Sequence, residues 1–208
     1  MTANRRPTWP ALLVLALAGT GCATKPEDTS AASSSSAATA APAPVPTSGK
    51  EPASEGGITL EKVTYDELLK RIAANKDAKL TIVDAWATWC GPCKENFPHI
   101  VAMHKKYADK GLAVISLSLD DPTEAKQVGE AKAFLNEKKA EFTNFLLDEE
   151  QGAAFEKLGT NTIPAVFLYG PDGKEIRRFT LDDPNSQFTY DEVEKTAEEL
   201  LAGKPLPQ

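Results

Sequence analysis

The sequence predicts an α/β fold in which helices cover both faces of a central mixed sheet. Short apolar runs of strand length alternate with longer segments that open on helix-start signals. The last two apolar runs flank a tight turn, so they form a hairpin and make part of the sheet antiparallel. Residues 57–208 are expected to form this fold as one domain, and they contain no obvious internal repeat.

The first half of the domain should run helix, strand, helix, strand. Residues 64–75 open with Thr-Tyr-Asp-Glu, the form of a capping box that begins a helix. Residues 80–86 (Leu-Thr-Ile-Val-Asp-Ala-Trp) are a mostly apolar run of strand length. The next helix should cover residues 90–110 with a kink at Pro98, because proline cannot donate a helical hydrogen bond. Residues 112–119 are the second apolar strand.

A further helix and a short strand follow. Asp121 is placed to cap a helix that begins near Pro122 and ends before Ala140. A proline at the first helical position and a glutamate at the third support this start. Residues 145–147 are then predicted to form a short strand.

The next helix is predicted between Asp148, as its cap, and Leu158. Gly159 should end it, because glycine adopts the left-handed backbone that terminates many helices. We interpret the acidic groups at 120–121 and 148–150 as helix starts, where carboxylates face the positive end of the helix dipole.

The C-terminal part should form a hairpin and a last helix. Residues 165–169 and 174–180 are the two strands, and 171–173 (Pro-Asp-Gly) are the turn between them. The last helix is predicted over residues 190–201.

Residues 1–21 have the form of an export signal. Two arginines come first, the apolar run 11–18 follows, and small residues precede Cys22. The apolar run is far shorter than the about 20 residues of a membrane-spanning helix.

A cysteine directly after such a signal resembles the bacterial lipobox, in which the cysteine becomes the first mature residue and carries acyl chains. Gly19 departs from that pattern, which usually has leucine three places before the cysteine. The alternative is an ordinary signal cleaved nearby, with Cys22 removed or left as a free thiol. We expect lipidation of Cys22, because a lone cysteine at this boundary otherwise lacks a purpose.

Residues 22–56 are predicted to be a disordered tether, because they are rich in Ala, Ser, Pro and Thr and have almost no large apolar residues. Such a tether has a root-mean-square reach of about 30–35 Å. The formal net charge is −7, and removing two arginines of the export segment gives −7 − 2 = −9. Without a Lys/Arg-rich cluster, no nucleic-acid partner is expected.

The segment Cys90-Gly91-Pro92-Cys93 has the sequence form of a dithiol that opens and closes as a disulfide. The alternatives are half of a zinc site or an inert disulfide. Zinc normally takes a second pair of ligands, so we favour redox exchange, without metal or cofactor. Cys90 is expected to attack from the helix start, and Cys93, one turn later, to resolve the mixed disulfide. Gly91 would let a substrate backbone approach, and Pro92 suits a first helical turn.

Residues 83–94 (Val-Asp-Ala-Trp-Ala-Thr-Trp-Cys-Gly-Pro-Cys-Lys) resemble the active-site strand and helix start of the thioredoxin superfamily. Thr162-Ile163-Pro164 resembles the cis-proline loop of that superfamily. The export signal, the continuation at 95–98 and the extra helix at 122–139 make the chain most similar to extracytoplasmic thiol-disulfide oxidoreductases of the TlpA/ResA type. The resemblance covers residues 60–202. It implies a thioredoxin fold with a helical insert between its βαβ and ββα halves.

The resemblance also implies roles for single residues. Asp84 would be a buried acid that accepts the proton of Cys93, with a pKa that burial raises towards neutrality. The alternative is a solvated aspartate at the end of the strand. Pro164 would be cis and face the dithiol, exposing the backbone of Ile163 to a substrate strand. The alternative is a trans proline in a loop.

The aromatic and histidine residues near the motif are less specific. Trp89 is expected on the apolar surface around Cys90, whereas Trp86 fits a core position equally well. His99 and His104 are five residues apart, so they do not share a helical face as a metal-binding pair would. A solvated helix surface is the expectation for both.

These features predict an exported, lipid-anchored oxidoreductase of the cell envelope that reduces cysteine pairs in other extracytoplasmic proteins. The TlpA/ResA resemblance implies substrates such as apocytochrome c or copper-site proteins, and a membrane protein that relays electrons. A copper chaperone using the same two sulfurs is the alternative, because thiolates suit Cu(I). A peroxidase of the peroxiredoxin type would need a Thr-x-x-Cys site, which the Trp89-Cys90 pair does not provide.

Overall fold

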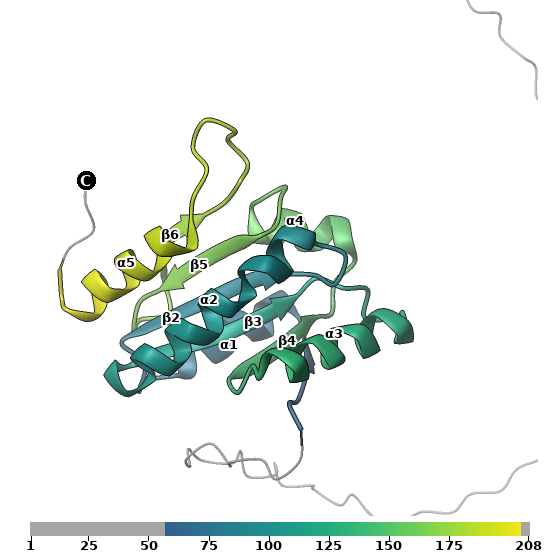
Figure 1. Ribbon diagram of the computed structural model, residues 1–208, viewed down its shortest axis with the longest axis horizontal. Coiled ribbons are helices and arrows are strands. Elements are labelled where there is room, and N and C mark those ends of the chain that lie inside the picture. The colour runs from purple at the N-terminus through teal and green to yellow at the C-terminus, as the bar shows by residue number, and fades with distance from the viewer. Residues whose placement is uncertain (1–56, 205–208) are drawn as a thin grey trace, which may run out of the picture. The chain divides into compact units, whose positions relative to one another are not determined.

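The computed structural model describes residues 57–204 (Figure 1). The predicted export signal, the lipidation site at Cys22 and the tether lie outside these residues. The strands are β1 (Glu61–Val63), β2 (Leu80–Trp86), β3 (Leu112–Ser118), β4 (Thr143–Leu147), β5 (Ala165–Tyr169) and β6 (Glu175–Phe179). The helices are α1 (Tyr65–Ala74), α2 (Gly91–Tyr107), the short 3-10 helix η1 (Ala108–Lys110), α3 (Ala125–Lys138), α4 (Gln151–Leu158) and α5 (Tyr190–Leu201).

The strands form one mixed sheet in the order β1-β4-β3-β2-β5-β6. The neighbours β1–β4, β4–β3 and β3–β2 are parallel, whereas β2–β5 and β5–β6 are antiparallel. The predicted mixed sheet and C-terminal hairpin are therefore confirmed. Strand β1 was not predicted, because three residues without an apolar run carry no strand signal of their own.

Alternate residues of β2 face two different apolar layers. Leu80, Ile82 and Trp86 pack with α2, α3 and α5, which lie in front of the sheet in Figure 1. Val83 and Ala85 pack with α1 and α4 on the opposite face. All seven residues of β2 are buried, so this strand is the centre of the core.

The predicted extra helix is α3, and it packs over the start of α2. Phe134 of α3 lies 4.8 Å from the ring of Trp86 and 5.1 Å from the ring of Phe97, measured between ring centroids. The insert also contributes β4, which lies between β1 and β3. Helix α2 continues from Gly91 to Tyr107 through Pro98.

Two predicted helix starts are wrong by two to three residues. Glu124, not Asp121, is the N-cap of α3, because the Asp121 carboxylate instead accepts hydrogen bonds from the N–H and O–H of Thr123 in a local turn. Glu150, not Asp148, is the N-cap of α4, and its carboxylate accepts hydrogen bonds from the N–H groups of Gly152 and Ala153. Gly159 ends α4 with a φ of 64°, as predicted.

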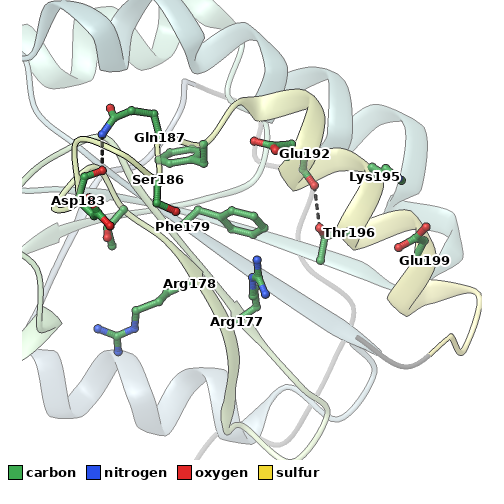
Figure 2. Close-up of a pocket in the computed structure, with 12 residues that line it drawn as sticks. Arg177, Arg178, Phe179, Asp183, Ser186, Gln187, Glu192, Lys195, Thr196 and Glu199 are labelled. Carbon is green, nitrogen blue, oxygen red and sulfur yellow. Dashed lines mark hydrogen bonds between the residues drawn. The ribbon is translucent and has the colours of Figure 1, made fainter. Parts of the chain in front are cut away.

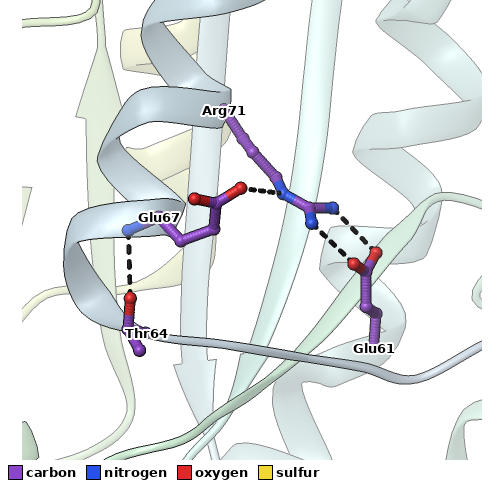
Figure 3. A network of polar contacts seen from close by, with 4 residues as sticks. All are labelled: Glu61, Thr64, Glu67 and Arg71. Atoms are coloured by element: carbon purple, nitrogen blue, oxygen red, sulfur yellow. Dashed lines mark hydrogen bonds and ion pairs between the residues drawn. The ribbon is translucent and has the colours of Figure 1, made fainter. Parts of the chain in front are cut away.

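The predicted capping box of α1 is only half formed. Thr64 Oγ1 accepts a hydrogen bond from the N–H of Glu67 at 3.3 Å, but the Glu67 carboxylate turns to Arg71. Arg71 also makes two hydrogen bonds to Glu61, at 2.6 and 2.7 Å (Figure 3). This network links α1 to β1. A complete capping box begins α5 instead, between Thr189 and Glu192.

A substitution at Gly173, in the β5–β6 turn, tests how tightly the hairpin packs on α1. Its φ is +77°, and an added Cβ would lie 2.7 Å from the Cα and Cβ of Ala73. Gly173→Ala should therefore lower the free energy of unfolding by about 2 kcal/mol or more, measured by urea denaturation.

The matched control is Gly129→Ala in the exposed middle of α3, where an added Cβ meets nothing within 4 Å. This substitution should raise the free energy of unfolding by about 1 kcal/mol, because alanine favours a helix. Equal stability of the Gly173→Ala variant and the wild type would contradict the close packing.

Candidate active site

Cys90 and Cys93 form a disulfide at the start of α2, with their Cα atoms 5.3 Å apart. Cys90 is the N-cap, and its sulfur accepts a hydrogen bond from the N–H of Cys93 at 3.2 Å. The first turn of a helix stabilises negative charge, so this position favours a thiolate on Cys90 once the disulfide is reduced. Cys90 is 6% exposed and Cys93 is 1% exposed, which makes Cys90 the more accessible sulfur.

The loop before β5 brings a cis-proline to the disulfide. The Ile163–Pro164 peptide bond is cis, the geometry that the family resemblance implies. The carbonyl oxygen of Ile163 lies 3.8 Å from the Cys90 sulfur. The backbone of residue 163 is therefore beside the reactive sulfur, where an extended substrate segment would need it.

Asp84 lies in the middle of β2, fully buried, on the face that packs against α2 and α5. Its Oδ1 accepts a hydrogen bond from the Tyr190 hydroxyl at 2.8 Å. Its Oδ2 is also buried and accepts no hydrogen bond from the residues that the structure describes. Loss of hydration raises the pKa of Asp84 to about 7, and the Tyr190 hydrogen bond opposes this rise. The alternative of a solvated strand-end aspartate does not fit this burial.

Asp120 holds the loop between β2 and the cysteines, a role that sequence reasoning missed. Its buried carboxylate accepts hydrogen bonds from the Thr88 N–H at 3.1 Å, the Thr88 O–H at 2.6 Å and the Ser118 O–H at 2.7 Å. The prediction that Asp120 belongs to a helix start is wrong, because α3 begins after a further turn. A short side chain directly after β3 can reach the loop after the adjacent parallel strand.

The two tryptophans have different environments. Trp86 is completely buried, and its ring lies 5.3 Å from that of Phe97, so it is a core residue. Trp89 is 51% exposed directly before Cys90. Trp89 is among the residues that line a groove of about 1060 Å³ between α4 and the loops that follow β3 and β4. Its exposure beside the disulfide suits contact with a partner protein.

A smaller cavity of about 310 Å³ has Pro92, Pro164, His99 and Tyr190 among its lining residues. His99 is exposed, as expected, and stacks on the Tyr190 ring at 5.8 Å. The solvated position expected for His104 is wrong, because this residue is half-buried against the Phe142 ring. Within residues 57–204, no group of three or more Asp, Glu, His or Cys residues is arranged to hold a metal ion.

A third cavity, of about 400 Å³, lies between β6, the loop after it and α5 (Figure 2). Arg177 and Lys195 line it together with Glu192 and Glu199, so its charges are mixed. It contains neither cysteine and is separate from the disulfide.

Comparison with known proteins agrees with this geometry. Residues 41–200 match the model of the Redoxin family. The chain belongs to the Redoxin family. It is 30% identical over 137 residues to the thiol-disulfide oxidoreductase ResA of Bacillus subtilis strain 168, covering 64% of this chain and 71% of that protein. It is 27% identical over 110 residues to ResA of Bacillus thuringiensis subsp. konkukian, covering 53% of this chain and 60% of that protein.

The structure is also similar to a thioredoxin-like protein in its oxidised form, with a TM-score of 0.51 and 20% identity. That match covers 69% of this chain and 86% of the other, and it confirms the thioredoxin fold. With a disulfide-bonded Cys-x-x-Cys at the helix start, this Redoxin family member is a thiol-disulfide oxidoreductase of the TlpA/ResA-like type.

Tyr190 and Asp120 are the site residues that the sequence did not reveal. Tyr190 was predicted only as the start of the last helix, and no local pattern connects it to a strand 106 residues earlier. A buried acid in β2 does signal that some distant donor must reach it, because a carboxylate is costly to bury without one. The sequence cannot say which donor.

The raised pKa of Asp84 predicts a pH-dependent stability. Between about pH 4 and pH 7 the folded protein keeps a proton that the unfolded chain has released, so stability falls as pH rises through this window. The loss is on the order of 4 kcal/mol by pH 8. Asp84→Asn, which stays neutral, should remove this loss, as measured by urea unfolding of the oxidised protein at about pH 4 and pH 8.

Asp109→Asn on the exposed η1 is the control and should keep the wild-type pH dependence. An Asp84→Asn variant whose stability changes with pH as the wild type's does would show that Asp84 is not the group responsible.

Proposed function

We propose that this protein is exported, is anchored to a membrane through acyl chains on Cys22, and reduces disulfides in other extracytoplasmic proteins. The observation that supports the chemistry is the position of Cys90, which caps α2 and lies 3.8 Å from the backbone carbonyl of Ile163. The export signal, Cys22 and the tether-like composition of residues 22–56 support the location.

The reaction follows from the two sulfurs. In the reduced protein, the Cys90 thiolate attacks a substrate disulfide, forms a mixed disulfide and expels one substrate thiolate. The Cys93 thiol then loses its proton and attacks the Cys90 sulfur. The Cys90–Cys93 bond forms, the bond to the substrate breaks, and the second substrate sulfur leaves as a thiolate that takes a proton. The substrate gains two electrons, and the dithiol loses two.

The helix start does not by itself favour the reducing direction. Negative charge on Cys90 is stabilised only in the reduced form, and stabilising the dithiol relative to the disulfide would by itself make the protein more oxidising. We base the reductase assignment on the Gly91-Pro92 pair, which matches reducing thioredoxins, and on the similarity to ResA. Proposed substrates are cysteine pairs of apocytochrome c or of copper-site proteins. Continued turnover requires a membrane partner that returns electrons to the Cys90–Cys93 disulfide.

Trapping tests this function. Cys93→Ser keeps the attacking Cys90 but removes the resolving sulfur, so a mixed disulfide with the partner should persist. Expressed in a bacterial envelope, the variant should run as higher-mass species that disappear on reduction, and mass spectrometry would identify the partner.

Cys90→Ser is the matched control and should trap nothing, because Cys93 is almost completely buried. Reduced wild-type protein should also cleave insulin disulfides, and both single variants should lose turnover. Trapping by neither variant, together with no insulin reduction by the wild type, would contradict the proposal.

The anchor is tested by detergent phase partitioning of the full-length protein expressed in a bacterium. The wild type should enter the detergent phase, since several acyl chains anchor a protein stably where one does not. Cys22→Ser is the control and should not enter it. Recovery of the mature wild type in the aqueous phase would rule out the lipid anchor.

A further inference from the structure

Tyr190 connects the start of α5 to the buried acid of β2. Its hydroxyl oxygen lies 2.8 Å from Asp84 Oδ1, although the two residues are 106 positions apart in the chain. Both side chains are buried, with Tyr190 5% exposed and Asp84 0% exposed. The Tyr190 hydroxyl is the hydrogen-bond donor that the described residues supply to this carboxylate.

The position of the Tyr190 ring is held from several sides. The capping box between Thr189 and Glu192 fixes the first turn of α5, where Tyr190 is the first residue. Phe188 packs on the ring at 5.6 Å, and His99 of α2 stacks on it at 5.8 Å. Burial and the nearby Asp84 raise the pKa of Tyr190, so its hydroxyl remains protonated and continues to donate.

The two oxygens of Asp84 are therefore not equivalent. Oδ1 is occupied by the Tyr190 hydroxyl, whereas Oδ2 is buried and receives no hydrogen bond from the described residues. Asp84 and Cys93 belong to the same apolar layer, because β2 directs Asp84 to the same side as Ile82 and Trp86, which pack with Cys93.

We propose that Tyr190 is a positioning residue for the resolving step: its hydroxyl holds Asp84 through Oδ1 and leaves Oδ2 to accept the proton of Cys93. This inference rests on the proposed thiol exchange and adds a residue to it. The proton moves from the Cys93 thiol to Oδ2, the Cys93–Cys90 bond forms, and the Cys90–substrate bond breaks with release of a substrate thiolate. Tyr190 keeps its own proton throughout.

Within residues 57–204, Asp191 of α5 lines the cavity beside Tyr190 together with His99. Cys93 and His99 come from α2, with His99 on the outer side of the Tyr190 ring. The neighbouring strands place Ser116 of β3 and Val166 of β5 beside Asp84, and neither titrates. On α5, Glu194 instead accepts hydrogen bonds from Lys106 and Tyr107.

The inference is tested with the reduced protein and dithiobis-nitrobenzoate. The first nitrothiolate released reports attack by Cys90, and the second reports resolution by Cys93. Tyr190→Phe keeps the ring but removes the donor that stabilises the Asp84 carboxylate. The pH midpoint of the second phase should rise by about 1–2 units, the size of one hydrogen bond to a charged group. At pH 7 the second phase should slow by about ten-fold, with the first phase unchanged.

Tyr107→Phe is the matched control. Tyr107 is also a buried tyrosine, but its hydroxyl donates to Glu194 and not to Asp84. This substitution should leave both phases as in the wild type. Asp84→Asn should abolish the pH midpoint of the second phase. Circular dichroism and urea unfolding confirm that each variant is folded. A Tyr190→Phe variant with the wild-type midpoint overturns the inference, whereas a wild type without a second phase overturns the proposed function itself.

Discussion

The burial of β2 is the constraint on which the rest of this structure depends. The strand has neighbours on both sides and apolar layers on both faces, so each of its residues is removed from water. Its direction is therefore fixed, and the loop after Trp86 must emerge at one defined edge of the sheet. The N–H of Leu119 bonds the carbonyl of Trp86 at 2.8 Å, which fastens the end of β2 to the end of β3. Cys90 follows the end of β2 by four residues and Cys93 by seven.

The active site combines one local feature with two long-range contacts. The local feature is the helix start, where Cys90 caps the same helix that contains Cys93. The first long-range contact is between Asp120, after β3, and the Thr88 loop. The second is made by the cis-proline loop, which brings Ile163 beside the Cys90 sulfur. Each comes from the end of a strand that pairs directly with β2. The sheet order thus brings together groups that are far apart in the chain.

Local patterns were less reliable at helix starts than in the core. Asp121 and Asp148 both have the right residue type for a cap, yet the chain caps α3 and α4 at Glu124 and Glu150. Several carboxylates lie near each helix start. A local turn, such as that between Asp121 and Thr123, can use a carboxylate oxygen that would otherwise cap the helix. The helices themselves were predictable, because their length and apolar spacing depend on many residues rather than on one.

By itself the sequence determined the α/β class, the mixed sheet with its terminal hairpin, and the paired cysteines at a helix start. These depend on apolar runs, turn residues and short spacings, which are contained in neighbouring residues. Only the tertiary structure decided that β1 joins the sheet beside β4, that Asp120 supports the active-site loop, and that Tyr190 is the partner of Asp84. Those contacts join segments far apart in the chain, and they exist only once packing has excluded water and brought the segments together.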